Sequence, residues 1–182
     1  MTKDKVPPRP TPDRDKKYMG LAFMYAALSK DPRTQHGAQI VTPENDPLGW
    51  GYNGPPKQMD DEDLNWDRPD KYPYMVHSEP NAISHSDKEK LEGSIMYVTG
   101  KPCAKCMLDI VRAGIKEVVY YEDESHHDSN SMCVNPEHMD TTEDIAERGG
   151  VKMRAYSGDL DWLRDRVAVL EGFGVFSCRS LK

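Results

Sequence analysis

The sequence predicts an α/β protein, a three-layer α-β-α sandwich around a central mixed sheet of five strands. Three observations indicate this class. An amphipathic helix comes first, two short apolar segments follow it as a hairpin, and helices and strands then alternate. A hairpin contributes antiparallel strands, whereas helix–strand alternation contributes parallel strands whose connecting helices cover the sheet. No repeat or linker divides the chain, so we expect one domain over residues 14–182, preceded by a tail over residues 1–13.

The first half of the chain accounts for one helix and the hairpin. Apolar residues at three- and four-residue steps predict a helix over 13–29. Residues 38–41 form an apolar strand candidate, and residues 48–52 return as its hairpin partner after a turn. Residues 54–71 form a long acidic loop that contains prolines. A loop of that length in a compact domain is usually functional or mobile.

The remaining elements alternate. In chain order we expect a helix over 81–90, a strand over 94–99, a helix over 103–113, a strand over 117–121, a polar loop over 122–138, a helix over 141–148, a strand over 151–155 and a last amphipathic helix over 160–170. Gly149 and Gly150 end the helix before the last strand, because glycine is the favoured residue just past a helix C-terminus.

Composition restricts the function classes. The chain has 182 residues and 24 Lys and Arg against 31 Asp and Glu, a formal net charge of −7. This acidic balance argues against wrapping duplex nucleic acid through phosphate contacts. No apolar run reaches the about 18–20 residues that span a bilayer, and the N-terminus leads into prolines, so we expect a cytoplasmic protein without membrane contact. The proline-rich, polar residues 1–13 predict a disordered tail.

Two motifs place metal-binding residues at the starts of predicted helices. They are His77–Glu79 and Pro102–Cys106. Cys103 and Cys106 are three residues apart, so they point the same way from one helical turn and can bind one ion. A helix N-terminus also favours thiolate over thiol. With His77 as a nitrogen ligand, three protein ligands leave one tetrahedral position for water, which is typical of catalytic zinc.

Charge gives Glu79 a different role from the ligands. Zinc with two thiolates and a neutral imidazole is formally neutral, so it acidifies water less than an all-histidine site, and a carboxylate is needed to take the proton. Glu79 is two residues from His77, projects away from the ligand direction and can lie over that water. We expect it to accept the proton of that water as a general base.

The alternatives explain fewer residues. A C-x-x-C motif alone is also typical of structural zinc or of a redox pair. A structural site needs a fourth ligand, for which Cys133 or His138 is available, and a redox pair explains neither His77 nor Glu79.

The order H-x-E and then P-C-x-x-C is a known signature of zinc-dependent nucleobase deaminases. From about Tyr18 to Tyr156, the chain resembles the deoxycytidylate deaminases of the cytidine deaminase superfamily. Further segments that carry the resemblance are Ser29–Pro32, Gly37-Ala38, GYNG at Gly51–Gly54, KYPY at Lys71–Tyr74, Asn81–Ile83, Met96–Val98 and AGIKE at Ala113–Glu117. The resemblance implies a cytidine deaminase-like fold, one catalytic zinc ion, and hydrolytic deamination of dCMP to dUMP with release of ammonia, supplying thymidylate synthesis.

The resemblance also implies substrate contacts. Asn53 is similar to the asparagine that holds the sugar and phosphate region, and the backbone N–H of Ser78 would hold the pyrimidine O2. Arg33 falls where some relatives have a phosphate-binding arginine, with a solvated surface charge as the alternative. His126 takes the place of a tyrosine that stacks on the base. Ser78 itself replaces the usual alanine, which we expect to matter little because the backbone makes the contact.

Regulation and assembly are further implications. Family members are activated by dCTP and inhibited by dTTP, part of the effector site is the loop after GYNG, and they are commonly hexamers, so we expect a homo-oligomer. In this chain the loop carries four carboxylates at Asp60–Asp63. They repel a triphosphate unless Mg²⁺ lies between them, so an effector would bring Mg²⁺.

Other interpretations stay open on the sequence. The substrate is alternatively a 5-modified dCMP or another cytosine nucleotide. A nucleic-acid deaminase would need basic, aromatic-interleaved patches, and the loops here are acidic. A nucleotide sensor without turnover would not need Glu79. The loop residues His126, His127, Cys133 and His138 suggest either a second metal or a polar surface, and their spacing favours the surface.

Overall fold

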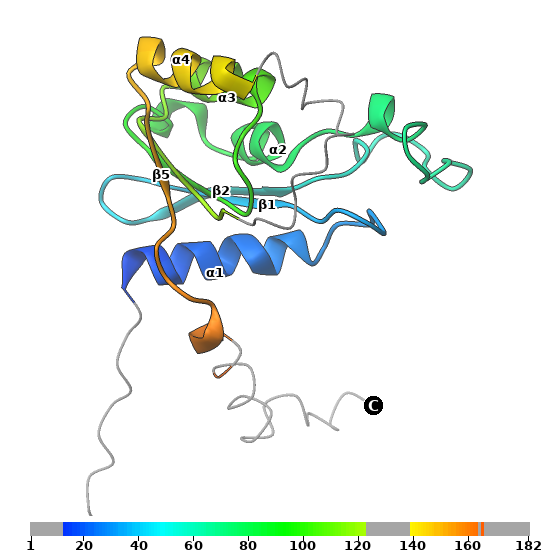
Figure 1. Cartoon of the computed structure of the whole chain (residues 1–182), viewed down its shortest axis with the longest axis horizontal. Coiled ribbons are helices and arrows are strands. Elements are labelled where there is room, and N and C mark those ends of the chain that lie inside the picture. Colours follow the sequence, from blue (N-terminus) through cyan, green and yellow to red (C-terminus); the bar gives the residue numbers. More distant parts are fainter. Residues whose placement is uncertain (1–12, 123–138, 164, 166–182) are drawn as a thin grey trace, which may run out of the picture.

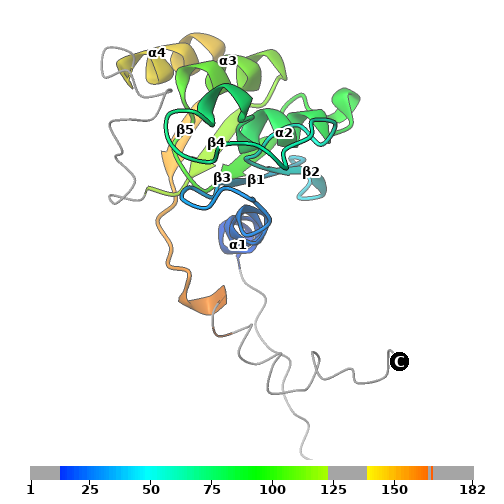
Figure 2. The ribbon, with the colours of Figure 1, turned by 90° about the vertical axis from the view of Figure 1, so that its right-hand side faces the viewer.

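The computed structural model describes residues 13–122, 139–163 and 165. Its elements are, in chain order, α1 (Arg14–Ala26), β1 (Gly37–Val41), β2 (Pro47–Tyr52), η1 (Tyr72–Tyr74), α2 (Ser78–Ser84), η2 (Lys88–Lys90), β3 (Ile95–Val98), α3 (Ala104–Arg112), β4 (Glu117–Tyr120), α4 (Met139–Gly149) and β5 (Lys152–Ala155). Helix α1 covers one face of the sheet, and α2, α3 and α4 cover the other (Figures 1 and 2). The predicted three-layer class is confirmed.

The sheet has the strand order β2-β1-β3-β4-β5. Strand β1 pairs antiparallel with β2 and β3, while β3, β4 and β5 run parallel. The predicted hairpin therefore supplies the antiparallel pair β1 and β2, and the predicted helix–strand alternation supplies the parallel strands β3, β4 and β5. All residues of β1 and β3 are buried, because helices lie on both faces of these strands.

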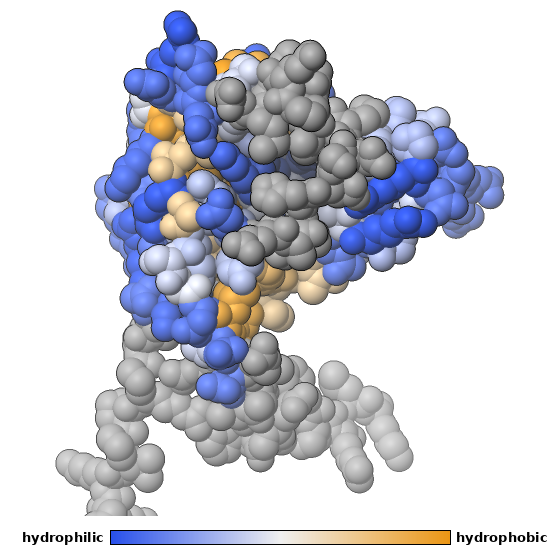
Figure 3. All heavy atoms as spheres, viewed as in Figure 1, coloured by the Kyte–Doolittle hydropathy of each residue, from blue (hydrophilic) through white to orange (hydrophobic). Residues whose placement is uncertain are grey.

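Two apolar cores result, one on each face. The core between the sheet and α1 includes Tyr18, Met19, Val41, Tyr97 and Val119. The core on the other face joins the sheet to α2, α3 and α4 and includes Ile40, Met96, Met107, Ile110 and Val118. The outer surface in the view of Figure 3 is largely hydrophilic, with its largest apolar area beside α1. No described helix has both the length and the apolar character needed to cross a bilayer.

The helix predicted over 81–90 is wrong at both ends. Helix α2 begins at Ser78 and includes Pro80. It tolerates this proline because backbone N–H groups in the first turn have no partner within the helix, so the missing N–H costs no hydrogen bond. It ends at Ser84, and the Ser86 hydroxyl donates to the Ala82 carbonyl oxygen at 2.8 Å. Asp87 then caps the separate turn η2 by accepting from the Glu89 amide.

The other predicted elements differ from the structure by a few residues at their ends. Gly150 has a φ of 65° and ends α4 as predicted. The predicted tail and the polar loop lie outside the described residues, apart from Asp13 and Glu122. Of the last predicted helix, residues 160–163 and 165 are described, and all of these except residue 160 are helical. Residues 54–71 form the predicted loop and extend beyond the layers in Figure 1, returning through paired backbone hydrogen bonds between Gly54 and Val76.

Candidate metal centre

The structure brings together the three side chains that the two motifs predict as ligands. His77 is the N-cap of α2, Cys103 is the N-cap of α3, and Cys106 lies one turn into α3. The Nδ1 atom of His77 lies 3.3 Å from the Cys106 sulfur and 3.8 Å from the Cys103 sulfur. The three ligand atoms all lie within 4.8 Å of one another.

These positions fit a zinc ion. A tetrahedral zinc bound at about 2.3 Å to sulfur and about 2.0–2.1 Å to nitrogen holds those two atoms about 3.5 Å apart. The observed separations of 3.3 and 3.8 Å fall on either side of that value. Two thiols and one imidazole are also donors that suit zinc, whereas magnesium and calcium prefer oxygen. The residues present therefore support a zinc centre with three protein ligands.

Electrostatics at the centre also favour a cation. Hydrogen bonding with Cys103 and burial raise the pKa of the Cys106 thiol, and the negative charge of Glu79 adds to this. The pKa of His77 is raised to about 9 by its hydrogen bond with Cys103, although burial opposes the shift. In both groups the hydrogen bond with Cys103 is the main cause of the raised pKa, and the charge of Glu79 adds to it. A divalent cation bound there would stabilise thiolates and a neutral imidazole instead.

Glu79 lies beside the ligand atoms, although it is not one of the three. It is 5% exposed and belongs to the first turn of α2. Its negative charge raises the pKa of both the Cys106 thiol and His77. The carboxylate that sequence reasoning assigned to proton transfer is therefore at the centre.

The residues expected to contact substrate have different environments. Asn53 is buried, and its amide donates to the Thr34 carbonyl oxygen at 2.8 Å and accepts from the His36 amide at 2.7 Å. Arg33 is exposed and donates to Asp67 Oδ1 at 3.0 Å. Ser78 is fully buried next to Glu79. His126 lies outside the described residues, as do His127, Cys133 and His138.

Several residues that support the centre were not predicted. Gly51 faces α2 so closely that a Cβ atom there would lie 2.5 Å from the Ser78 carbonyl oxygen. The Asn81 amide donates to the Tyr52 carbonyl oxygen at 2.8 Å and so joins α2 to β2. Lys71 and Asp31 form a buried ion pair. All four residues lie in segments that carry the family resemblance, but nothing in the sequence pattern indicates these contacts.

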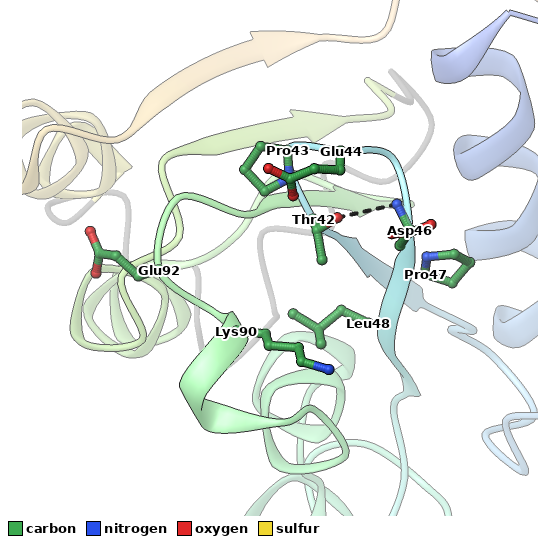
Figure 4. A pocket seen from close by; sticks show the side chains of 8 residues that line it. All are labelled: Thr42, Pro43, Glu44, Asp46, Pro47, Leu48, Lys90 and Glu92. Carbon is green, nitrogen blue, oxygen red and sulfur yellow. Dashed lines mark hydrogen bonds between the residues drawn. The ribbon is translucent and has the colours of Figure 1, made fainter.

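Two other features lie apart from the centre. The side chain of Lys101 donates to Glu143 of α4 at 2.7 Å. A pocket at the opposite end of β1 is lined by none of the candidate residues (Figure 4). Its lining residues are Thr42, Pro43, Glu44, Asp46, Pro47, Leu48, Lys90 and Glu92.

A mixed sheet between helical layers, with a His-Cys-Cys centre beside a buried glutamate, defines the class of zinc-dependent hydrolytic deaminases. Residues 12–122 match the family described as the cytidine and deoxycytidylate deaminase zinc-binding region. The chain belongs to this family.

Curated relatives and solved structures agree with this assignment. The deoxycytidylate deaminases of Pongo abelii and Homo sapiens are each 44% identical over 119 residues, which is 62% of this chain and 66% of their own length. The dCMP deaminase of the cyanophage S-TIM5 in complex with dCMP and dUMP aligns with a TM-score of 0.61 at 23% identity, over 81% of this chain and 100% of that one. Its apo form gives a TM-score of 0.59 at 24% identity, over 80% and 99%. At these identities the structural matches show the shared fold.

Proposed function

We propose that the protein is a zinc-dependent enzyme that hydrolytically deaminates dCMP to dUMP and ammonia, and so supplies dUMP for thymidylate synthesis. The observation that carries this proposal is the convergence of His77, Cys103 and Cys106 beside the buried carboxylate of Glu79. The substrate class is supported by the identity to curated deoxycytidylate deaminases.

In this mechanism His77, Cys103 and Cys106 hold the metal, which supplies an acidified water when bound. Glu79 takes a proton from that water and delivers it to a ring nitrogen of cytosine, while the water oxygen adds to the carbon that bears the amino group. Glu79 then takes the remaining proton from the hydroxyl now on that carbon and gives it to the amine, so that the carbon–nitrogen bond breaks, ammonia leaves and the carbonyl of dUMP forms. The backbone N–H of Ser78, at the start of α2, would hold the pyrimidine O2.

The other substrate contacts are those that the family resemblance implies. Asn53 bridges the His36 amide and the Thr34 carbonyl oxygen before β1, and from there it would hold the sugar and phosphate region. Arg33 would bind the phosphate in exchange for Asp67, because an exposed ion pair is worth little and exchanges readily. His126 would stack on the base.

Regulation and assembly complete the proposal. The acidic loop over 54–71 would bind dCTP or dTTP together with Mg²⁺, since its carboxylates otherwise repel a triphosphate. We propose a homo-oligomer, with a hexamer as the form that the family resemblance implies. We place the protein in the cytoplasm, where thiols that ligate metal stay reduced.

The test is ammonia release on metal-analysed protein. Substrates are dCMP, its 5-methyl and 5-hydroxymethyl forms, CMP, dCTP and a cytosine-containing single strand, with and without dCTP and dTTP as effectors. We expect dCMP to be preferred, about one zinc per chain, and loss of activity on chelation. Glu79→Gln should keep its zinc and lose about 10²–10⁴-fold in rate. Preference for a modified base or for the strand would overturn the substrate assignment, and a zinc-loaded protein that releases no ammonia would indicate a nucleotide sensor.

A further inference from the structure

Ser78 uses its side chain in a way that a backbone contact to substrate does not require. Its hydroxyl donates to Glu79 Oε2 at 3.0 Å. Ser78 is 0% exposed and Glu79 is 5% exposed, so the hydrogen bond is shielded from water. The hydroxyl is therefore directed at the carboxylate beside the metal centre, and not at an unpaired amide of the first helical turn.

The chemistry of this hydrogen bond favours a positioning role. A glutamate side chain has three rotatable bonds, and a general base works only when its oxygen is held within reach of the proton it moves. Hydrogen bonds to an ionised acceptor are roughly twice as strong as neutral ones. A hydroxyl that holds one carboxylate oxygen leaves the other oxygen as the one available for proton transfer.

We propose that Ser78 is a positioning residue for the reaction, because its hydroxyl fixes Glu79 Oε2 and so presents Oε1 to the water and then to the ring nitrogen. This inference rests on the proposed function. It differs from the expectation that serine in place of alanine matters little here. The backbone N–H of Ser78 keeps its own role at the pyrimidine O2, so the two functions of this residue are separable by mutation.

Ser78→Ala separates them, because it removes the hydroxyl and leaves the backbone in place. We expect kcat for dCMP to fall about tenfold, a part of the about 10²–10⁴-fold that general acid–base catalysis contributes. KM should stay within about twofold, because ground-state binding is unchanged. Zinc content and the thermal midpoint should match the wild type. Ser84→Ala is the matched control, since Ser84 lies in the same helix, is exposed and donates to the Asn81 carbonyl oxygen.

A second comparison distinguishes positioning from general packing. In a Glu79→Gln background, where no carboxylate remains to be oriented, adding Ser78→Ala should change the remaining rate by less than about twofold. An active wild type with an unchanged kcat in Ser78→Ala would overturn this inference alone. The same fold-loss in both backgrounds, or a loss confined to KM, would do so too. A wild type that deaminates no cytosine compound would overturn the proposed function and the inference with it.

Discussion

The ammonium nitrogen of Lys71 lies 2.6 Å from each carboxylate oxygen of Asp31. The two side chains are only 2% and 3% exposed. Asp31 Oδ1 also accepts the backbone N–H groups of Arg33 and Thr34, so the carboxylate organises the turn before β1. Because Lys71 starts the segment that leads to His77, the ion pair joins two parts of the chain that border the metal centre.

Breaking this pair should destabilise the fold strongly. Lys71→Met leaves the carboxylate of Asp31 buried without its partner, which is expected to cost about 3–5 kcal/mol in the free energy of unfolding. The double variant with Asp31→Asn should cost less than the sum of the two single variants, since it leaves no uncompensated buried charge. Urea unfolding of the four proteins measures this coupling. Additive effects would show that the pair does not act as a unit.

Lys30→Met is the matched control for this prediction. Lys30 also forms an ion pair, with Asp61 at 2.8 Å, but its side chain is 66% exposed. Solvent and salt screen such a pair, so the urea midpoint should not change measurably. A large shift in this control would show that the loss in Lys71→Met is not specific to burial.

The same ion pair predicts how stability depends on pH. Burial alone would raise the pKa of Asp31, but hydrogen bonds from Lys71 and from the amides of Arg33 and Thr34 outweigh it and lower the pKa. A carboxyl with a lowered folded pKa stabilises the fold above its unfolded pKa of about 3.9, and this contribution is lost as pH falls through the folded pKa. The acid limb of the wild-type stability curve should therefore be steeper than that of Asp31→Asn.

Local pattern was enough to predict the five strands, the hairpin and the metal ligands. The three ligand positions follow from motif spacing at two helix starts, so the sequence alone placed His77 with Cys103 and Cys106. The start of α2 was mispredicted because Pro80 suggests a boundary, whereas the first helical turn tolerates it. The pairing of Lys71 with Asp31 joins residues 40 positions apart, and no periodicity signals such a contact.

Gly51 should matter for catalysis because it sets the distance between β2 and α2. A Cβ atom at this position would lie 2.4 Å from the Ala82 amide nitrogen and 2.5 Å from the Ser78 carbonyl oxygen. Both neighbours are backbone, so Gly51→Ala must displace the first turns of α2, which also carry Glu79. We expect a loss of about 1–3 kcal/mol in stability. Since a displacement of about 1 Å can cost about 10²-fold, kcat/KM should fall by about that factor.

Two further glycines give controls for this prediction. A Cβ atom at Gly49 would meet the Ala82 carbonyl oxygen at 2.7 Å and the Ser86 hydroxyl at 1.9 Å, farther along α2 from Glu79. Gly49→Ala should therefore reduce stability with a much smaller effect on kcat/KM. Gly54→Ala meets no atom within 4 Å and should change neither quantity. Equal losses of kcat/KM in the Gly49 and Gly51 variants would contradict a specific role for Gly51.

Arg33 and Asp67 should act in opposite directions on substrate binding. The chain carries a net charge of −7, so a nearly dianionic nucleotide is attracted only by a local cation. If Arg33 binds the phosphate, Arg33→Ala should raise KM for dCMP about tenfold, the loss of one charge-assisted contact, while leaving KM for deoxycytidine unchanged. Asp67→Asn removes the carboxylate that now holds the guanidinium, so it should lower KM for dCMP.

Lys30→Ala removes a cation of similar exposure and should leave both KM values unchanged. Steady-state kinetics at two salt concentrations checks this, because an electrostatic effect weakens as ionic strength rises. Equal KM values in all four proteins would mean that Arg33 is a solvated surface charge.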